Sequence, residues 1–200
     1  NRYNQILSQL KSKMNDVSET LTNLKVKSAP LQRLKLMYNS CKTGQREIAL
    51  SEPLYHKLHE TGKLLMPTVD SESRTRIAND LSSCEKQWLD IIASLDSRKE
   101  SLKEILHLWD DTEAGMEDTL AWLKGIRHEV TRELPVTYDD LVMALQQCQE
   151  FENSFANAGD KRGQLSQQHQ RLRTCESAEE TGVLQQRLMV LDTQWQEMLH

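Results

Sequence analysis

The chain has 200 residues, of which 28% are charged, with only four prolines, seven glycines and 5% aromatic residues. This composition favours long helices and supplies too few β-branched and aromatic residues for a sheet, so we expect an all-α fold. The net charge of −5 argues against a nucleic-acid-binding surface, and no apolar run approaches the about 20 residues that cross a bilayer, which argues against membrane insertion of this segment.

Proline and polar breaks divide the sequence into six helical segments, at residues 2–27, 32–66, 71–98, 99–132, 138–174 and 178–200. The breaks fall at Ala29-Pro30, Pro67, Leu134-Pro135 and Glu176-Ser177, where proline or polar residues favour a turn. Pro53 lies inside the second segment, where we expect a kink or short break. The sequence does not begin with Met or a signal peptide, so we expect a piece of a longer protein whose last helix is cut short.

An internal repeat organises the chain. A gapless shift of 107 residues places apolar residues on apolar residues through most of the sequence. The matched pairs include Leu34 and Leu141, Cys41 and Cys148, Ile48 and Phe155, Leu65 and Leu172, Leu81 and Leu188, and Trp88 and Trp195. Because Trp is rare and both copies share the same Leu-x6-Trp frame, we interpret residues 1–98 and 99–200 as two copies of one three-helix unit.

An apolar series with seven-residue spacing crosses the junction between the two units. It comprises Leu81, Trp88, Leu95, Leu102, Trp109, Met116, Leu123 and Val130, with a companion series of Ile77, Cys84, Ile91, Arg98, Ile105, Thr112, Thr119 and Ile126. This spacing is typical of coiled-coil core positions, and no Pro or Gly interrupts residues 68–114. We therefore predict one helix of about 60 residues, roughly 90 Å long, shared by both units. Leu95, Arg98, Leu102 and Ile105 form its linker segment, and Arg98 marks the point where the core passes between units.

Three helices per unit of about 106 residues, joined by a shared helix, resemble tandem repeats of the spectrin family. Trp122, within Ala121-Trp122-Leu123, looks like the family's first-helix Trp, and Trp195 looks like its third-helix Trp. The core signature consists of Trp88, Trp109, Trp122, Trp195, Leu81 and Leu188. The first unit departs from the pattern because Asn15 stands where this Trp is expected, so Met14 or Val17 must fill the layer.

The resemblance implies an elongated, non-enzymatic rod segment of a giant cytoskeletal linker, which acts as a spacer, a force-transmitting element and a docking scaffold. The nesprins of the nuclear envelope are the first choice of family, followed by dystrophin, utrophin and the plakins. The implied partners are neighbouring repeats of the same chain and regulators of the actin cytoskeleton, for example formins. The implied location is the cytoplasm and its cytoskeleton, with attachment to the outer nuclear membrane through other parts of the protein.

Charge is distributed unevenly and suggests one docking site. Residues 1–46 hold nine Lys or Arg against Asp16 and Glu19, which leaves twelve net negative charges for the rest of the chain. Four basic residues flank the first predicted turn and are candidates for binding an acidic partner, namely Lys25, Lys27, Arg33 and Lys35.

Other functions find less support in the residues. His56 and His59 stand three apart but lack a third metal ligand, the four cysteines form no CxxC pair, and the glycines form no phosphate loop, so we expect no metal and no cofactor. No nucleophile sits in a motif that would activate it, so we expect no enzyme. A membrane-binding bundle of the BAR type is the alternative reading, although the tandem repeat argues against it.

Overall fold

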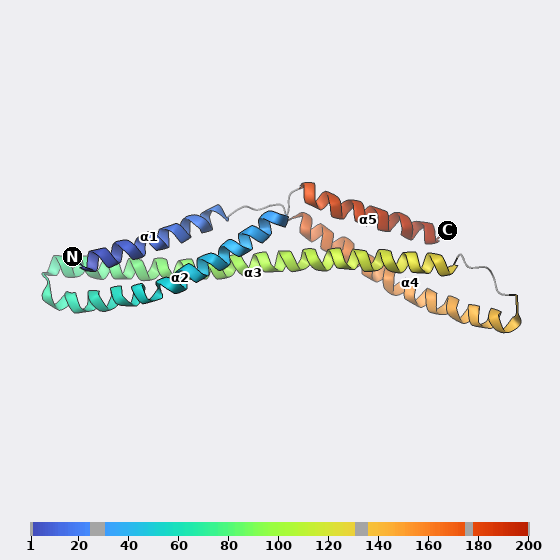
Figure 1. The fold of residues 1–200 in the computed structure, drawn as a ribbon, viewed down its shortest axis with the longest axis horizontal. Coiled ribbons are helices and arrows are strands. Elements are labelled where there is room, and N and C mark those ends of the chain that lie inside the picture. The colour runs from blue at the N-terminus through green and yellow to red at the C-terminus, as the bar shows by residue number, and fades with distance from the viewer. Residues whose placement is uncertain (1, 25–30, 131–135, 175–177, 200) are drawn as a thin grey trace. The chain divides into compact units, whose positions relative to one another are not determined.

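The computed structural model describes residues 2–24, 31–130, 136–174 and 178–199. Within these ranges the chain forms α1 (Arg2–Asn23), α2 (Leu31–Leu65), a short 3-10 helix η1 (Met66–Thr68), α3 (Ser71–Val130), α4 (Tyr138–Arg173) and α5 (Ala178–Leu199), as Figure 1 shows. The described residues contain no strand, and the prediction of an all-α fold is confirmed.

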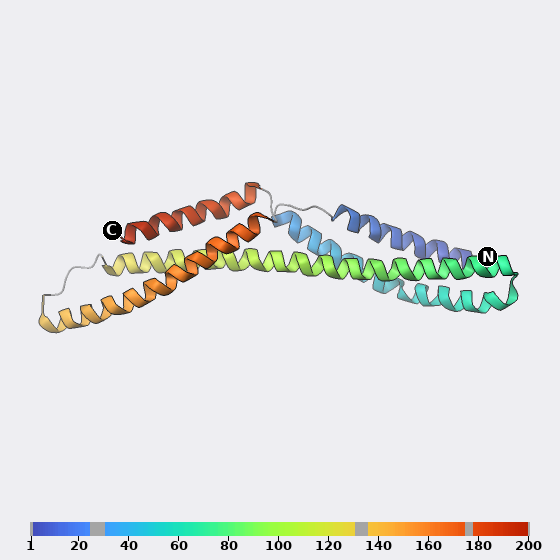
Figure 2. The same ribbon diagram turned by 180° about the vertical axis from the view of Figure 1, so that it is seen from behind.

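Helix α3 belongs to two compact units. Unit one contains α1, α2 from Gln32 onward and α3 up to Glu104, and unit two contains α3 from Ile105 onward, α4 and α5. The 60 residues of α3 are helical without interruption, so the prediction of one continuous helix through the junction is confirmed. Each unit is thus built from three helical segments, and Figures 1 and 2 show the same segments from opposite sides.

Capping residues define two of the helix starts. The Asp70 carboxylate accepts a hydrogen bond of 2.7 Å from the Ser73 N–H just before α3, and this bond holds the pKa of Asp70 below its ordinary value. Thr137 caps α4 because its Oγ1 accepts from the Asp140 N–H at 3.3 Å. The break predicted at Pro67 falls in η1, whereas those at residues 29–30, 134–135 and 176–177 lie outside the described residues.

The core of unit one uses residues from all three of its helices. Its buried members are Tyr3, Ile6, Leu7, Leu10, Met14 and Val17 from α1, Ile48 and Leu58 from α2, and Ile77, Leu81, Cys84, Trp88, Ile91 and Leu95 from α3. The α3 members are the residues of the two seven-residue series up to Leu95, so the heptad spacing translates directly into one buried stripe.

The core of unit two places polar threonines in the same stripe. Thr112 and Thr119 are buried beside Trp109, Met116 and Leu123. Their hydroxyls donate to carbonyl oxygens one turn earlier, Thr112 to Leu108 at 2.6 Å and Thr119 to Gly115 at 2.7 Å. Because each hydroxyl is satisfied within its own helix, burial carries no unpaired polar group at these positions.

Helix α2 runs through Pro53 without a break, so of the kink or short break expected there the break is wrong, while the kink stays a prediction. Proline removes a single backbone donor, while Ile48 and Leu58 anchor the helix in the core on either side. Two residues before Pro53, the Ser51 hydroxyl donates to the Glu47 carbonyl at 2.8 Å. Tertiary packing therefore outweighs the local preference of proline.

Candidate docking surface

Three aromatic rings form one packing layer in unit two. Trp195 of α5 is 6% exposed and stacks on Phe155 of α4, with 4.2 Å between ring centroids. Trp122 of α3 is half-buried, lies 6.2 Å from Trp195 and donates its Nε1–H to the Ser154 hydroxyl at 3.0 Å. The guanidinium of Arg162 covers the Trp195 ring at 5.4 Å. This layer ties all three helices of the unit together.

Unit one builds the matching layer from different residues. Trp88 is buried and stacks on Tyr55 of α2 at 4.8 Å. Tyr55 stands 107 positions before Arg162, so a ring covers one Trp where a guanidinium covers the other. Asn15 is exposed and accepts from Gln87 at 3.3 Å.

Met14 and Val17 are 0% and 2% exposed, and both belong to the core of unit one. They therefore occupy the buried face that α1 presents at the level where the first-helix Trp is missing.

The other predicted core positions are also placed in the two cores. Leu81 is buried in unit one, and a Cβ atom added to Gly62 would lie 2.8 Å from its Cδ1. Trp109 is buried in unit two with its Nε1 unpaired, and Leu188 is half-buried against the same core.

The predicted linker segment is held to unit one by polar contacts. Leu95 and Leu102 are 1% and 3% exposed. The half-buried Arg98 donates from its guanidinium to the Leu24 carbonyl. Ile105 packs against the core of unit two.

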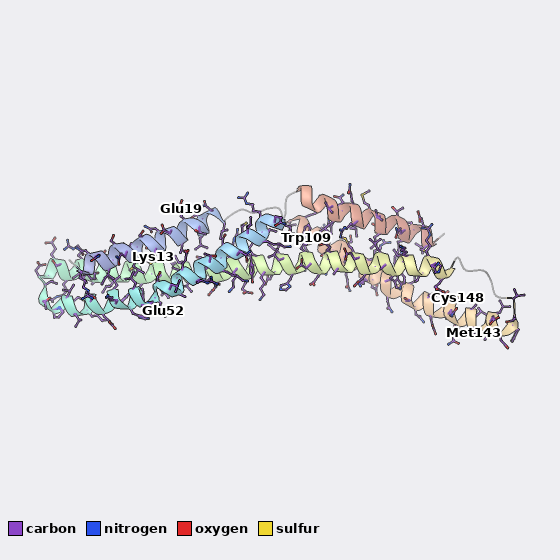
Figure 3. The ribbon with its side chains drawn as sticks, in the orientation of Figure 1. Lys13, Glu19, Glu52, Trp109, Met143 and Cys148 are labelled. Carbon is purple, nitrogen blue, oxygen red and sulfur yellow. The ribbon has the colours of Figure 1, made fainter. Side chains whose placement is uncertain are left out.

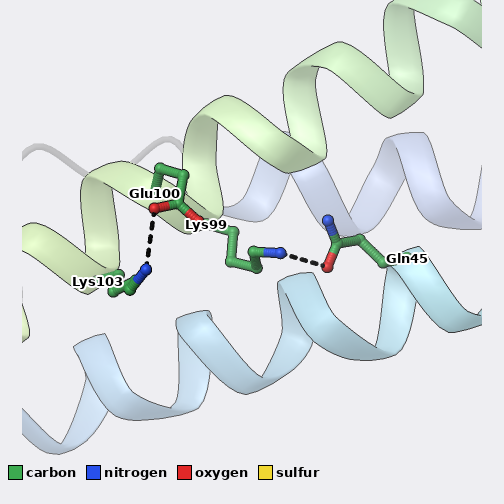
Figure 4. A network of polar contacts seen from close by, with 4 residues as sticks. All are labelled: Gln45, Lys99, Glu100 and Lys103. Carbon is green, nitrogen blue, oxygen red and sulfur yellow. Dashed lines mark hydrogen bonds and ion pairs between the residues drawn. The ribbon is translucent and has the colours of Figure 1, made fainter.

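A further polar contact joins this segment of α3 to α2. Lys99 donates to Gln45 Oε1 at 3.1 Å, and Lys103 pairs with Glu100 at 3.3 Å, as Figure 4 shows. The amide of the same Gln45 donates to Asp96, so Gln45 bridges two charged residues of α3.

Two of the four basic docking candidates can be placed. Arg33 and Lys35 are exposed in the first turns of α2, while Lys25 and Lys27 lie outside the described residues. The docking role of this group stays a prediction.

Acidic residues of α3 form ion pairs across unit two. Arg187 of α5 pairs with Glu113 at 2.9 Å and with Glu117 at 3.6 Å, and Lys161 of α4 pairs with Asp118 at 3.6 Å. Every side chain in these pairs is at least 37% exposed, so each pair contributes about 1 kcal/mol or less, and their main effect is to set which helix faces meet.

The histidine pair is not built as a metal site. His56 contacts Glu52 at 3.6 Å, whereas the His59 ring packs on Tyr55 at 4.5 Å with its Nε2 buried and unpaired. Over the described ranges, no group of three or more His, Cys, Asp or Glu side chains is arranged to hold a metal ion.

The first turns of α4 carry a large exposed apolar surface, which sequence reasoning missed. Every residue from Val136 to Glu150 is exposed except Ala144, which is half-buried. The large apolar side chains and their exposed fractions are Val136 96%, Tyr138 80%, Leu141 42%, Val142 48%, Met143 58% and Leu145 67%. Figure 3 marks Met143 and Cys148 on this part of α4.

The matching positions of unit one are buried. Leu34 and Cys41 are 3% and 0% exposed, whereas their equivalents Leu141 and Cys148 are exposed. The internal repeat assigned all four residues to the same helix face, so the sequence identified the face correctly but not its exposure. The difference follows from the register of the repeat: Leu95 lies near Gly44 of α2 in unit one, and its equivalent is position 202, which lies beyond His200, the last residue of the sequence.

Comparison with known proteins adds a family match. Residues 107–200 match the family model of the spectrin repeat. Over 196 aligned residues the chain is 23% identical to Nesprin-2 of Mus musculus, a match that covers 95% of this chain and 3% of the mouse protein. The chain therefore corresponds to a small part of that relative's length. Among the helices in the described ranges, none carries an apolar stretch long enough to cross a bilayer.

Proposed function

Residues 107–200 belong to the spectrin-repeat family, and from that premise we propose that the chain is a spacer and docking scaffold in a force-transmitting cytoskeletal linker. The similarity to mouse Nesprin-2 supports a linker of the nesprin kind, which would place the parent protein between the nuclear envelope and actin. Actin regulators such as formins are the partners we propose for its helical faces. Its contribution is mechanical and adhesive, with no chemical step.

The observation that carries this proposal is the continuity of α3 through both units. A loop at the junction would extend under tension before either core resisted it. A helix instead passes tension along backbone hydrogen bonds, and Leu95 and Leu102 are buried beside the junction. The contacts of Arg98 with Leu24 and of Lys99 with Gln45 fasten this stretch to the neighbouring helices of unit one.

A proline at the junction tests the proposal. Ser101 is exposed in α3, so Ser101→Pro changes no core contact but removes a helix donor and clashes with the preceding turn, which costs about 3 kcal/mol or more. We expect the two units of the unmodified chain to unfold at the same urea concentration and those of Ser101→Pro to unfold separately. Hydrogen exchange, read separately for unit one and unit two, gives both midpoints.

Ser101→Ala is the matched control, because alanine keeps the helix donor and favours helix. It should leave the two midpoints together. Separate midpoints in the unmodified chain, or coincident midpoints in Ser101→Pro, would contradict a coupling through α3.

A further inference from the structure

A groove lies between α1 and α2 in unit one. It holds about 660 Å³ of space, which is within the range of about 300 to 1,000 Å³ found for ligand pockets. Leu50, Pro53 and Leu54 form its apolar wall, and Lys13 and Lys57 stand beside them. Leu50 is 75% exposed. We call this feature the α1–α2 groove, and its remaining members are Gln9, Ser12 and Ser51.

The register of burial shows which residues of unit two are equivalent to this groove. Helices α2 and α4 match at the shift of 107 residues, as the buried pair of Leu58 and Leu165 illustrates. The buried residues of α1 and α3 match instead at a shift of 109, namely Tyr3 with Thr112, Leu7 with Met116, Leu10 with Thr119, Met14 with Leu123 and Val17 with Ile126. In this register Lys13, and not Asn15, takes the place of Trp122.

Two contacts close the equivalent place in unit two. The Trp122 ring of α3 packs against the Phe155 ring of α4 at 6.0 Å. One turn before Trp122, Asp118 pairs with Lys161 of α4 at 3.6 Å. The equivalent residues of unit one supply neither the ring nor the ion pair, and they are Lys13, Gln9 and Leu54.

The groove does not owe its exposure to an end of the sequence. In unit two the equivalent place is closed by side chains of the two helices that form it, and not by a third segment. In unit one the structure describes both of these helices on either side of the groove, from Arg2 to Asn23 in α1 and from Leu31 to Leu65 in α2. Unit one therefore lacks a side chain rather than a helix, and a partner can supply it.

Charge selects among the partners that fit. Of the described residues that line the groove, none is acidic and two are lysines. Within the described ranges, neither Lys13 nor Lys57 forms an ion pair. An acidic partner can therefore pair with both lysines without breaking an existing ion pair, whereas a basic partner is repelled.

We propose that the α1–α2 groove binds an acidic α-helix of a partner protein, which inserts one aromatic side chain beside Leu50 and Leu54 and places Asp or Glu next to Lys13 and Lys57. Trp122 shows the kind of ring that this position of the repeat accommodates. This inference rests on the docking role proposed above and names a partner class for it. It depends on binding and not on the continuity of α3.

Two other occupants fit the groove less well. A membrane presents a flat surface, which does not reach the half-buried Leu54 or Ser51, whose exposed fraction is 2%. A second copy of this chain has no free tryptophan to insert, because Trp122 is engaged in its own aromatic layer and the other three are at most 6% exposed, namely Trp88, Trp109 and Trp195.

Synthetic helical peptides provide the probe. One fluorescein-labelled peptide of about 18 residues, or five turns, carries a central Trp with Glu three and four residues to either side. A second peptide replaces the Trp with Ala, and a third replaces every Glu with Lys. By fluorescence anisotropy we expect the 200-residue chain to bind the first peptide at least ten times more tightly than the other two, and the affinity to fall as salt rises. Equal affinity for all three peptides, or no binding of the first, overturns the proposal.

Variants of the chain locate the site. Leu50→Glu should weaken binding of the first peptide at least tenfold, while Leu36→Glu, at a 65% exposed leucine of the same helix outside the groove, should leave it unchanged. Lys13→Trp places in unit one the ring that unit two has, so it should fill the groove and weaken binding more than Lys13→Ala, which removes the same charge but leaves the space. Circular dichroism confirms that each variant is folded. Equal affinities of Leu50→Glu and Leu36→Glu would refute the assignment.

Three measurements distinguish a separate partner from the other occupants. The parent chain and Leu50→Glu should sediment with the same mass, and the two should bind equally to vesicles of phosphatidylcholine and phosphatidylserine. A chain lengthened with natural sequence before Asn1 should still bind the first peptide. Self-association or vesicle binding that requires Leu50, or loss of peptide binding in the lengthened chain, overturns the proposal. These outcomes are independent of the Ser101→Pro test, which measures unfolding of the two units.

Discussion

Trp195→Ala should be among the most damaging single substitutions in unit two. The side chain is 6% exposed and contacts three groups at once, the Phe155 ring at 4.2 Å, the Trp122 ring at 6.2 Å and the Arg162 guanidinium at 5.4 Å. Replacing a buried Trp with Ala costs about 3 to 5 kcal/mol, through lost burial and the cavity left behind. A unit of this size is stable by about 5 to 15 kcal/mol in total, so the variant loses a large fraction of its stability.

Thermal and chemical unfolding measure this loss. In the Ser101→Pro background, where the two units are expected to unfold separately, each kcal/mol lowers the melting temperature of a domain of about 100 residues by about 4 to 8 °C, so the transition of unit two should fall by at least about 12 °C. Circular dichroism follows the helix content, and hydrogen exchange assigns the change to α4 and α5 rather than to α1 and α2. Gln167→Ala, an exposed position on α4, is the control and should change stability by less than about 0.5 kcal/mol. A loss below 1 kcal/mol for Trp195→Ala, or a loss shared equally by unit one in the Ser101→Pro background, would refute the aromatic layer as the centre of unit two.

Two further predictions concern buried polar groups of unit one. Tyr3 is 3% exposed with its hydroxyl unpaired, and burial raises its pKa to about 12. Tyr3→Phe should therefore keep or raise stability at pH 7 and abolish the loss of stability expected of the parent chain as pH rises from 10 to about 12. A clear loss of stability in urea melts at pH 7 would instead indicate that the Tyr3 hydroxyl makes a hydrogen bond. Burial, aided by Lys63 and His56 and opposed by Glu85, lowers the pKa of His59 below its ordinary value of 6.5. The folded state then binds fewer protons than the unfolded state, so unit one should weaken as pH falls through 6.5, and His59→Gln should flatten this dependence in urea melts at pH 7.5 and 5.5.

The features that follow from local spacing were predictable from the sequence. Heptad spacing from Ile77 to Ile126 identifies the buried stripe of α3, because side-chain direction in a helix depends only on position along it. The absence of Pro and Gly between residues 68 and 114 allows that helix to continue through the junction. The short break, one of the two outcomes expected at Pro53, does not occur, because packing on both sides of the proline outweighs its local penalty.

The features that depend on contacts between helices were not predictable. Leu34 and Leu141 occupy the same position of the repeat, yet one is 3% and the other 42% exposed. Sequence equivalence reveals which way a residue points, but not whether another helix covers it. In unit one Leu95 of α3 lies near this face of α2, and its equivalent position 202 lies beyond His200. The pair of Tyr55 and Arg162 gives the same lesson, since a ring and a guanidinium cover equivalent tryptophans. Neither residue alone indicates that it covers a ring.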